Sequence, residues 1–446
     1  MLKILYKSDN QRSQLVKLNI LIGAGVRGFS ILASLMLVPL TINYISSELY
    51  GIWLTLSSVI HWIGFFDIGF GNGLRNRLGE SIALGDYKKG KSYVSTTYAV
   101  LMILFTLLAV GLFFLAEYVN WSSFLNVSEQ YNTILVEVAQ ILLIAFSIQM
   151  VLKLIQNVIQ AFQLNALAAF FDALGNILAL VFIYVLTITL APDLTLIAIA
   201  YSLSPIIILL LASVIMYSTK FKNVAPHYKF IKWNYAKEIF SLGSEFFIIQ
   251  IASLVLYQMI NILISRLCGS EEVTNYNVAY KYFAVLTMVF TIVLAPIWSA
   301  FTDAYVKNDV KWMTNIYNRL VKLFVLSAVA IVILVVISPI VYDLWIGDSI
   351  NVAFSTSVLV GFYTIINVWA SIHSTILNGM GKIRFQVLYS VIIMVLFIPL
   401  ALFLGHMFKL PGILLAMILV NVPGFFFGRY QVLGLINKTV SGIWTK

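Results

Sequence analysis

One stretch decides the fold: Leu323-Phe-Val-Leu-Ser-Ala-Val-Ala-Ile-Val-Ile-Leu-Val-Val-Ile-Ser-Pro-Ile-Val-Tyr342. It is free of charged residues, and a helix of this length spans the hydrocarbon core of a bilayer, which is about 30 Å thick. A barrel strand would cross in about ten residues of alternating polarity, whereas this run is continuous and twice as long. Lipid offers the backbone no hydrogen-bond partner, so we expect a transmembrane α-helix here.

Similar apolar runs recur along the whole chain. Of its 446 residues, 61% are hydrophobic and only 10% are charged, too few charges to cover a soluble enzyme. The sequence predicts an all-α membrane protein whose twelve transmembrane helices cover residues 18–41, 50–70, 93–116, 133–152, 166–190, 194–217, 239–264, 278–301, 323–342, 352–377, 385–405 and 411–433.

The excess of positive charge has two competing explanations. A net charge of +10 suits a nucleic-acid surface, but it also suits the positive-inside bias of a multi-span protein. With twelve spans, nearly all of the 28 Lys and Arg residues fall on the side that holds both termini, and only Arg266 and Lys409 fall on the other. We therefore expect both termini in the cytoplasm, and no nucleic-acid partner is needed.

The two halves of the chain are weakly alike. Glu80 and Asp86 follow the second span, and Asp303 and Asp309 follow the eighth at a constant offset of 223 residues. Six spans per half give parallel repeats, related by a pseudo-two-fold axis along the membrane normal. The sequence thus predicts six-helix lobes at 1–217 and 239–446, joined by a basic cytoplasmic linker at 218–238, an arrangement suited to alternating access.

Charged side chains inside the spans are candidates for function, because they are costly in hydrocarbon and usually face a cavity or a partner. Arg27 lies roughly 14 Å into the first span, and Glu245 lies at a similar depth in the seventh, so we consider an ion pair between them. For the others, an interfacial position, a helix cap or ordinary packing is an alternative explanation; they are Asp67, Glu137, Asp172, Lys281, His61 and His373.

No known cofactor motif stands in a suitable context. The sequence has no P-loop, and Gly23-Ala-Gly25-Val-Arg-Gly28 fits a dinucleotide fingerprint but lies inside an apolar span, where small residues permit close helix packing. We expect a transporter rather than an enzyme, with no cofactor and no metal site.

Three sequence motifs resemble those of a known family. The runs Glu48-Leu-Tyr50-Gly51-Ile-Trp53 and Phe66-Asp67-Ile-Gly69-Phe-Gly71-Asn-Gly73-Leu-Arg75-Asn, and in the second half Ala295-Pro296-Ile-Trp298-Ser-Ala-Phe-Thr-Asp303-Ala-Tyr305, resemble bacterial O-antigen and polysaccharide flippases. These flippases belong to the multidrug/oligosaccharidyl-lipid/polysaccharide exporter superfamily.

This resemblance implies that the chain moves undecaprenyl-pyrophosphate-linked oligosaccharide repeat units from the cytoplasmic to the periplasmic leaflet of the bacterial inner membrane. It also implies H⁺ or Na⁺ as the coupling ion and a polysaccharide polymerase and chain-length proteins as partners. An anionic pyrophosphate needs cations to enter a medium of low dielectric constant. The candidates for substrate binding at the central cavity and cytoplasmic mouth are Arg27, Arg75, Arg77 and Lys281, and those for gating or ion coupling are Asp67, Asp172, Glu245, His61 and Glu137.

Two alternatives remain open at this point. One is a cation-coupled drug or metabolite exporter of the same superfamily, because the spans hold more acids than bases. The other is a membrane scaffold for polysaccharide assembly that transports nothing, against which the charges inside the spans argue.

Overall fold

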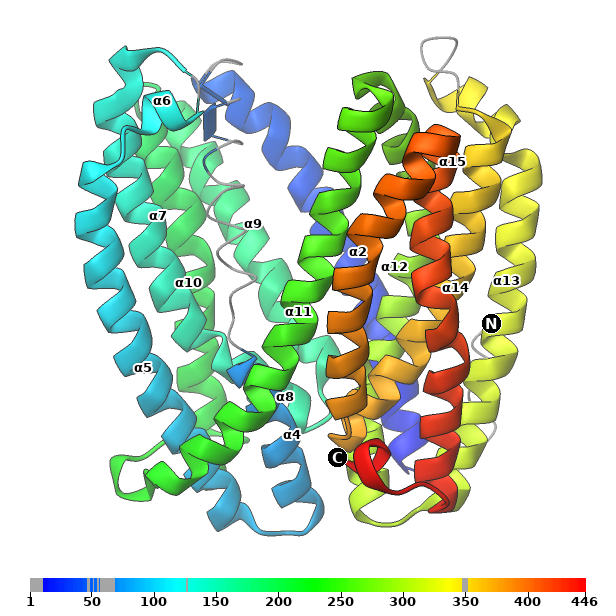
Figure 1. Ribbon diagram of the computed structural model, residues 1–446. Coiled ribbons are helices and arrows are strands. Elements are labelled where there is room, and N and C mark those ends of the chain that lie inside the picture. Colours follow the sequence, from blue (N-terminus) through cyan, green and yellow to red (C-terminus); the bar gives the residue numbers. More distant parts are fainter. Residues whose placement is uncertain are drawn as a thin grey trace. The chain divides into compact units, whose positions relative to one another are not determined.

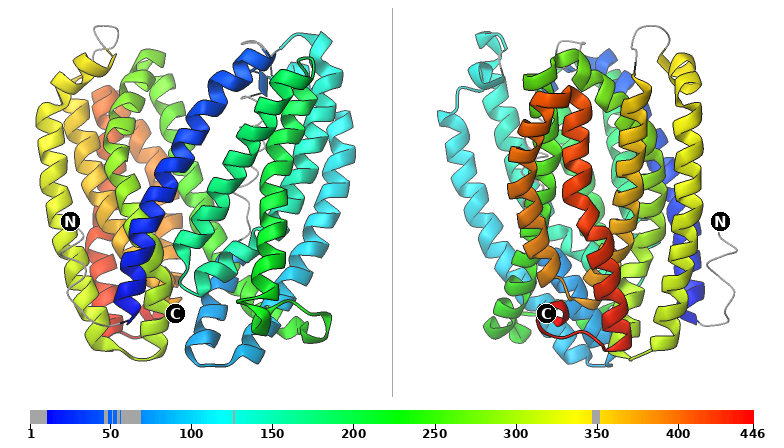
Figure 2. Two further views of the ribbon diagram at one scale, coloured as in Figure 1. Left: turned by 180° about the vertical axis from the view of Figure 1, so that it is seen from behind. Right: turned by 45° about the vertical axis from the view of Figure 1, so that its right-hand side comes forward.

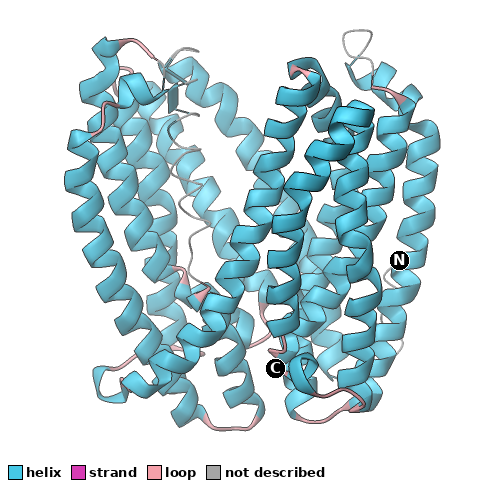
Figure 3. Ribbon diagram, viewed as in Figure 1, coloured by secondary structure: helices cyan, strands magenta, loops and turns pink. Residues whose placement is uncertain are grey.

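A computed structural model describes residues 11–45, 49–50, 52–53, 56, 69–125, 127–346 and 352–446. This part of the chain is helical and contains no strand (Figure 3). Nine helical stretches in it are long and apolar enough to cross a membrane. The all-α membrane fold is therefore confirmed, whereas the count of twelve spans stays a prediction.

The described helices cover every predicted span to within two residues at each end, except 50–70, most of which lies outside the described residues; several helices extend well beyond the predicted bounds. The helices, labelled in Figure 1, are α2 (Gln11–Ile45), α4 (Phe70–Ala83), α5 (Tyr87–Tyr118), α6 (Trp121–Leu125), α7 (Asn132–Leu152), α8 (Leu154–Ala161), α9 (Asn165–Thr189), α10 (Leu194–Ser218), α11 (Trp233–Cys268), α12 (Ser270–Val306), α13 (Val310–Ile346), α14 (Phe354–Met380) and α15 (Arg384–Asn437).

The chain folds into two compact units. Unit 1 comprises Met1–Lys17 and Glu245–Lys446, and unit 2 comprises Leu18–Ser244. The divisions fall inside α2 and α11, so each of these helices begins in one unit and ends in the other. The lobe and linker boundaries predicted from the sequence stay a prediction.

Unit 2 is built around α5, α7, α8, α9 and α10, whose apolar side chains form one continuous core. The short α8 is strongly two-sided: Leu154, Ile155, Val158 and Ile159 are buried, whereas its amide side chains lie on the other face. Two of the long helices begin at an aspartate cap. Asp86 accepts a hydrogen bond from the Lys89 backbone N–H at 2.9 Å, and Asp193 accepts one from Thr195 N–H at 2.7 Å.

Unit 1 packs α14 between α12 and α15. α15 is two helices joined at Lys409, whose backbone (φ 55°, ψ −137°) is not helical. The two parts run side by side in opposite directions (Figure 2). Gly412 follows this break and lies against the Leu404 carbonyl, so close that a Cβ atom would not fit there. The hairpin thus depends on a residue without a side chain.

The outer faces of the long helices are apolar. One stripe of α13 exposes Val325, Val329, Val332, Val336 and Ile340, each more than half accessible. A water-soluble monomer rarely exposes so continuous an apolar surface. This stripe is suited to contact with lipid tails, in agreement with a multi-pass membrane protein.

Candidate functional site

Polar side chains join α2 to α9 within unit 2. Asn19 donates to the Gln163 carbonyl and accepts from the Ala166 N–H, both at 2.8 Å, and Asn176 donates to Ser30 Oγ at 2.7 Å. The partners are 144 to 147 positions apart. A nearly constant separation means that the two helices run parallel, with matched polar positions along their contact. We call this contact the α2–α9 ladder.

Arg27 and Asp172 lie between the two ends of this ladder. The two side chains attract each other electrostatically, and Lys153 also acts on Asp172. Gln156 of α8 donates to Asp172 Oδ1 at 2.6 Å. Arg27 is half-buried and Asp172 is exposed in the isolated chain. The fold thus brings together two residues that the sequence assigned to different roles, an anion-binding base and a gating or coupling acid.

Arg75 and Arg77 lie on α4, where the sequence places the cytoplasmic mouth. Arg75 is buried, its guanidinium lies 3.4 Å from Asn165 Oδ1, and burial lowers its pKa to about 9, which leaves it charged at neutral pH. Arg77 forms an ion pair with Glu80 at 3.0 Å. Burial acts to lower the pKa of Arg77, but Glu80, Tyr93 and Glu238 together outweigh it and raise that pKa. Substrate contact by either residue stays a prediction.

Glu245 has a partner within unit 1. Its Oε1 lies 3.2 Å from Nε of Arg384, which begins α15. From the sequence, Arg384 is only one of the many basic residues that make up the positive-inside bias. The ion pair between Glu245 and Arg27 joins residues of different units and stays a prediction.

The remaining predicted residues give less information. Lys281 on α12 and Glu137 on α7 are exposed, and neither forms an ion pair with any residue that the structure describes. Asp67 and His61 lie outside the described residues. The roles of these four residues stay predictions.

His373 illustrates ordinary packing of a polar residue. It is buried in unit 1, with Nδ1 2.8 Å from the Trp369 carbonyl and Nε2 3.1 Å from the Tyr317 hydroxyl. A carbonyl can only accept, so Nδ1 carries the proton and Nε2 accepts from the tyrosine. Both ring nitrogens are satisfied inside the core, which suits a structural role.

Sequence reasoning missed Arg12 as a candidate functional residue. Arg12, in the first turn of α2, lies 2.6 Å from Asp303 and 2.8 Å from Asp309, and its guanidinium stacks over the Trp312 ring at 4.8 Å. Lys307 also pairs with Asp303, at 2.7 Å. These groups, which we call the Arg12 network, fix the start of α2 to unit 1. The repeat in the sequence had marked both aspartates but not their partner.

A corresponding contact fixes the start of α11 to unit 2. Tyr93 of α5 donates to Glu238 Oε2 at 2.7 Å, and its ring lies 4.7 Å from that of Tyr235. Arg77 attracts the same glutamate. The first helix of each half of the chain therefore begins in the unit that contains most of the other half.

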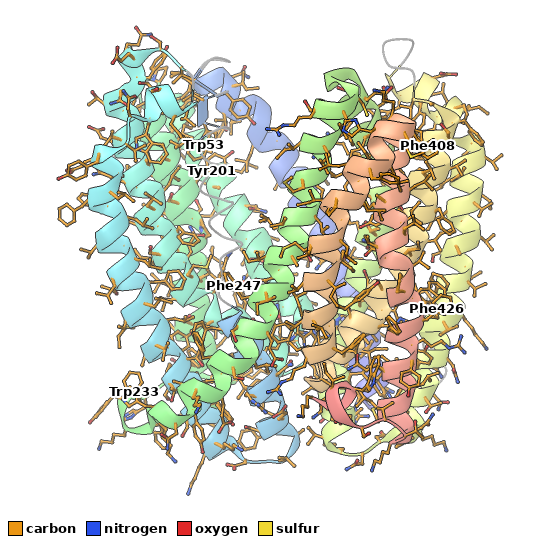
Figure 4. All side chains as sticks on the ribbon, in the orientation of Figure 1. Trp53, Tyr201, Trp233, Phe247, Phe408 and Phe426 are labelled. Atoms are coloured by element: carbon orange, nitrogen blue, oxygen red, sulfur yellow. The ribbon has the colours of Figure 1, made fainter. Side chains whose placement is uncertain are left out.

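Two aromatic side chains of unit 2 pack together near the last turns of α2. Trp53 and Tyr201, labelled in Figure 4, have ring centroids 5.1 Å apart, and the Tyr201 hydroxyl lies 3.5 Å from Thr41 of α2. Tyr44 donates to the Ala191 carbonyl at 2.6 Å. These contacts hold the last turns of α2 beside α10, as the α2–α9 ladder holds its middle.

Comparison with known proteins agrees with this architecture. A crystal structure of MATE in the bent conformation matches 99% of both chains with a TM-score of 0.79 at 16% identity. A transporter of the MOP superfamily from Pyrococcus furiosus matches 97% of this chain and 98% of its own, with a TM-score of 0.71 at 14% identity. At such low identity these likenesses show the fold alone.

Relatives found by sequence similarity have names that describe a function. A proposed O-antigen transporter of Salmonella typhi is 23% identical over 360 residues, which cover 78% of this chain and 80% of that protein. A proposed O-antigen export protein of Yersinia pseudotuberculosis is 22% identical, over 81% of this chain and 82% of that protein. Their names confirm the expectation of a transporter rather than an enzyme. A model of the polysaccharide biosynthesis protein family matches residues 16–302, well over half of the chain, and the chain therefore belongs to that family.

Proposed function

We propose that this protein is a flippase of the bacterial inner membrane that moves undecaprenyl-pyrophosphate-linked oligosaccharide units from the cytoplasmic to the periplasmic leaflet by ion-coupled alternating access. Family membership, the O-antigen names of the relatives and the apolar helices support this proposal. The coupling ion is H⁺ or Na⁺, and the delivered units pass to a polysaccharide polymerase and to chain-length proteins.

The observation that carries the proposal is the position of Arg27 on the α2–α9 ladder. A pyrophosphate group is strongly anionic, and moving it through a medium of low dielectric constant is costly unless a cation compensates its charge. Arg27 is a fixed cation in the predicted first span, half-buried and situated on α2 between Asn19 and Ser30, the two residues that hold the α2–α9 ladder. A planar guanidinium binds phosphate oxygens through two parallel hydrogen bonds, which a single ammonium cannot do.

Asp172 promotes release of the pyrophosphate headgroup from Arg27. In the structure it attracts Arg27, so an incoming pyrophosphate competes with this carboxylate for the same guanidinium. When Asp172 is charged, it favours departure of the headgroup; when it binds H⁺ or Na⁺, Arg27 is available to the substrate. The pair therefore links the affinity for an anion to the occupancy of a cation site, as ion coupling requires.

The experiment is deletion of the gene followed by complementation in the bacterium that carries it. We expect the deletion strain to accumulate lipid-linked repeat units on the cytoplasmic leaflet and to lose surface polysaccharide. Wild-type protein should restore the polysaccharide, Arg27→Ala should not, and Arg27→Lys should restore it partly, because the charge remains but the bidentate geometry is lost.

Arg266→Ala is the matched control. It removes one exposed arginine in the last turn of α11 and should complement fully. Immunoblots of membrane fractions establish equal abundance of all variants. Unchanged surface polysaccharide in the deletion strain would overturn the proposal. If that strain were instead hypersensitive to cationic drugs, the drug-exporter alternative would replace it.

A further inference from the structure

The connection between α10 and α11 is a folded part of unit 2. Residues 219–232 include two 3₁₀ turns, Lys222–Val224 and Tyr228–Phe230. The His227 backbone N–H donates to Ser95 Oγ and the Lys232 N–H donates to Thr96 Oγ1, both at 3.0 Å. Ser95 and Thr96 are buried in α5. This connection is therefore held at fixed positions against α5, unlike a free tether.

It carries a concentrated positive charge. Residues 219–237 contain five lysines and no acid, and the start of α5 adds three lysines beside them. Lys91 of α5 lies 4.8 Å from the Phe230 ring, which joins the two segments into one surface. The nearby acids are engaged, since Asp86 caps α5 and Glu238 accepts from Tyr93. We call this the linker surface; its lysines are Lys88, Lys89, Lys91, Lys220, Lys222, Lys229, Lys232 and Lys237.

Large aromatic side chains project from the same surface. Tyr228 is 73% exposed, and Trp233, which is labelled in Figure 4, is 60% exposed. Lys229 lies 5.8 Å from the Tyr228 ring. Tyrosine and tryptophan are enriched where membrane meets water, because their rings are apolar while their O–H and N–H groups remain hydrated.

The ends of three candidate membrane spans fix the level of the linker surface. α10 ends at Ser218, α11 begins at Trp233 and α5 begins at Tyr87. The linker surface therefore lies beside the ends of three candidate spans, where lipid headgroups are expected, on the side where the charge distribution predicts the cytoplasm. We propose that it binds the anionic phospholipid headgroups of that leaflet, through its lysines, with Tyr228 and Trp233 inserted among them.

The positive-inside bias alone does not explain this arrangement. That bias requires lysines on one side of the membrane but no particular loop structure. Here two buried hydroxyl groups position the loop, and the exposed aromatic rings lie among the lysines. Clusters of four to eight basic residues next to a span bind anionic lipid with about 1 kcal/mol per residue. The inference is independent of the substrate, so its failure would leave the flippase proposal untouched.

The test is native mass spectrometry of the purified full-length protein, titrated in detergent with phosphatidylglycerol or with phosphatidylcholine of the same acyl chains. We expect the wild type to retain phosphatidylglycerol in preference. Lys229→Gln with Lys232→Gln should weaken that binding by about 25-fold, or about fivefold for each lysine. Tyr228→Ser with Trp233→Ser should weaken retention of both lipids and leave the preference for phosphatidylglycerol in place.

The matched control is Lys322→Gln with Lys438→Gln, which removes two exposed lysines of unit 1 and should leave lipid binding unchanged. Equal melting temperatures establish that every variant is folded. An equal loss in both lysine pairs would overturn the proposal in favour of nonspecific net charge. The proposal would also be overturned if the wild type showed no preference for phosphatidylglycerol. If the linker variants nevertheless lost activity in cells, that result would indicate an acidic protein partner instead.

Discussion

Arg27 and Asp172 gain their significance from each other. Depth along a span identifies Arg27 as a costly charge that must serve a purpose. The sequence alone leaves open whether Asp172, at the start of another span, lies at an interface or faces a partner. The α2–α9 ladder answers this question, because parallel helices place residues 145 positions apart at the same level.

The residue-scale prediction concerns this pair. Asp172→Asn removes the competing carboxylate while keeping the hydrogen bond from Gln156 feasible. We expect the purified variant to bind inorganic pyrophosphate up to about fivefold more tightly, the range for a solvent-accessible ion pair. Isothermal titration calorimetry at neutral pH measures this change.

Asp343→Asn is the matched control, since it removes one exposed acid of α13 and should leave pyrophosphate affinity unaltered. If both variants tightened binding equally, the effect would reflect net charge, and Asp172 would have no direct influence on Arg27.

At the scale of helices, Arg12 forms two ion pairs that hold the first turns of α2. Arg12→Ala leaves Asp303 with Lys307 but deprives Asp309 of its charged donor. We expect a loss of about 1–3 kcal/mol in the free energy of unfolding, the usual contribution of hydrogen bonds to charged groups. Hydrogen–deuterium exchange over residues 11–17 should become faster in the purified protein.

Lys17→Ala provides the comparison on the same helix, because Lys17 is exposed and lies in the same unit. Its exchange over residues 11–17 should equal that of the wild type. Unchanged exchange in Arg12→Ala would show that the apolar contacts of α2 hold these turns without the Arg12 network.

The hairpin within α15 depends on steric fit rather than on charge. A methyl group at Gly412 would collide with the Leu404 carbonyl, and backbone cannot move aside as a flexible side chain can. Gly412→Ala should therefore destabilise the protein by about 1–3 kcal/mol, as overpacking usually does. Thermal unfolding in detergent measures the shift.

For Gly111→Ala we expect no loss of stability. No atom of another part of the chain lies within 4 Å of a Cβ built at Gly111, two turns before the end of α5. Alanine favours a helix by up to about 1 kcal/mol over glycine, so this variant should melt at or above the wild-type temperature. A lower melting temperature for Gly111→Ala than for Gly412→Ala would contradict the steric explanation.

At the scale of the whole molecule, the charge distribution predicts topology. Green fluorescent protein fused after Lys446 should fluoresce, because it folds in the cytoplasm, whereas alkaline phosphatase inserted after Pro192 should be active on the other side. Nearly all Lys and Arg residues would then lie on the cytoplasmic side. An active phosphatase after Lys446 would contradict the predicted orientation.

Much of the architecture follows from local patterns in the sequence. The described helices lie where the apolar runs lie, because in lipid a helix is the simplest structure that pairs every backbone group. The break inside α15 was also predicted, since Lys409 and Pro411 separate two apolar runs. The start of α2 was not, because its interactions depend on residues nearly 300 positions away.

The sequence by itself determined that this chain is an all-α membrane protein and a relative of the polysaccharide flippases, because hydropathy and loop motifs are read over short distances. Only the tertiary structure decided which charged groups interact: Glu245 pairs with Arg384, Arg12 pairs with Asp303 and Asp309, and Arg27 is close enough to Asp172 for electrostatic attraction. The physical reason is that an ion pair needs its two groups within a few ångströms. The packing of helices, and not their spacing in the chain, sets that distance.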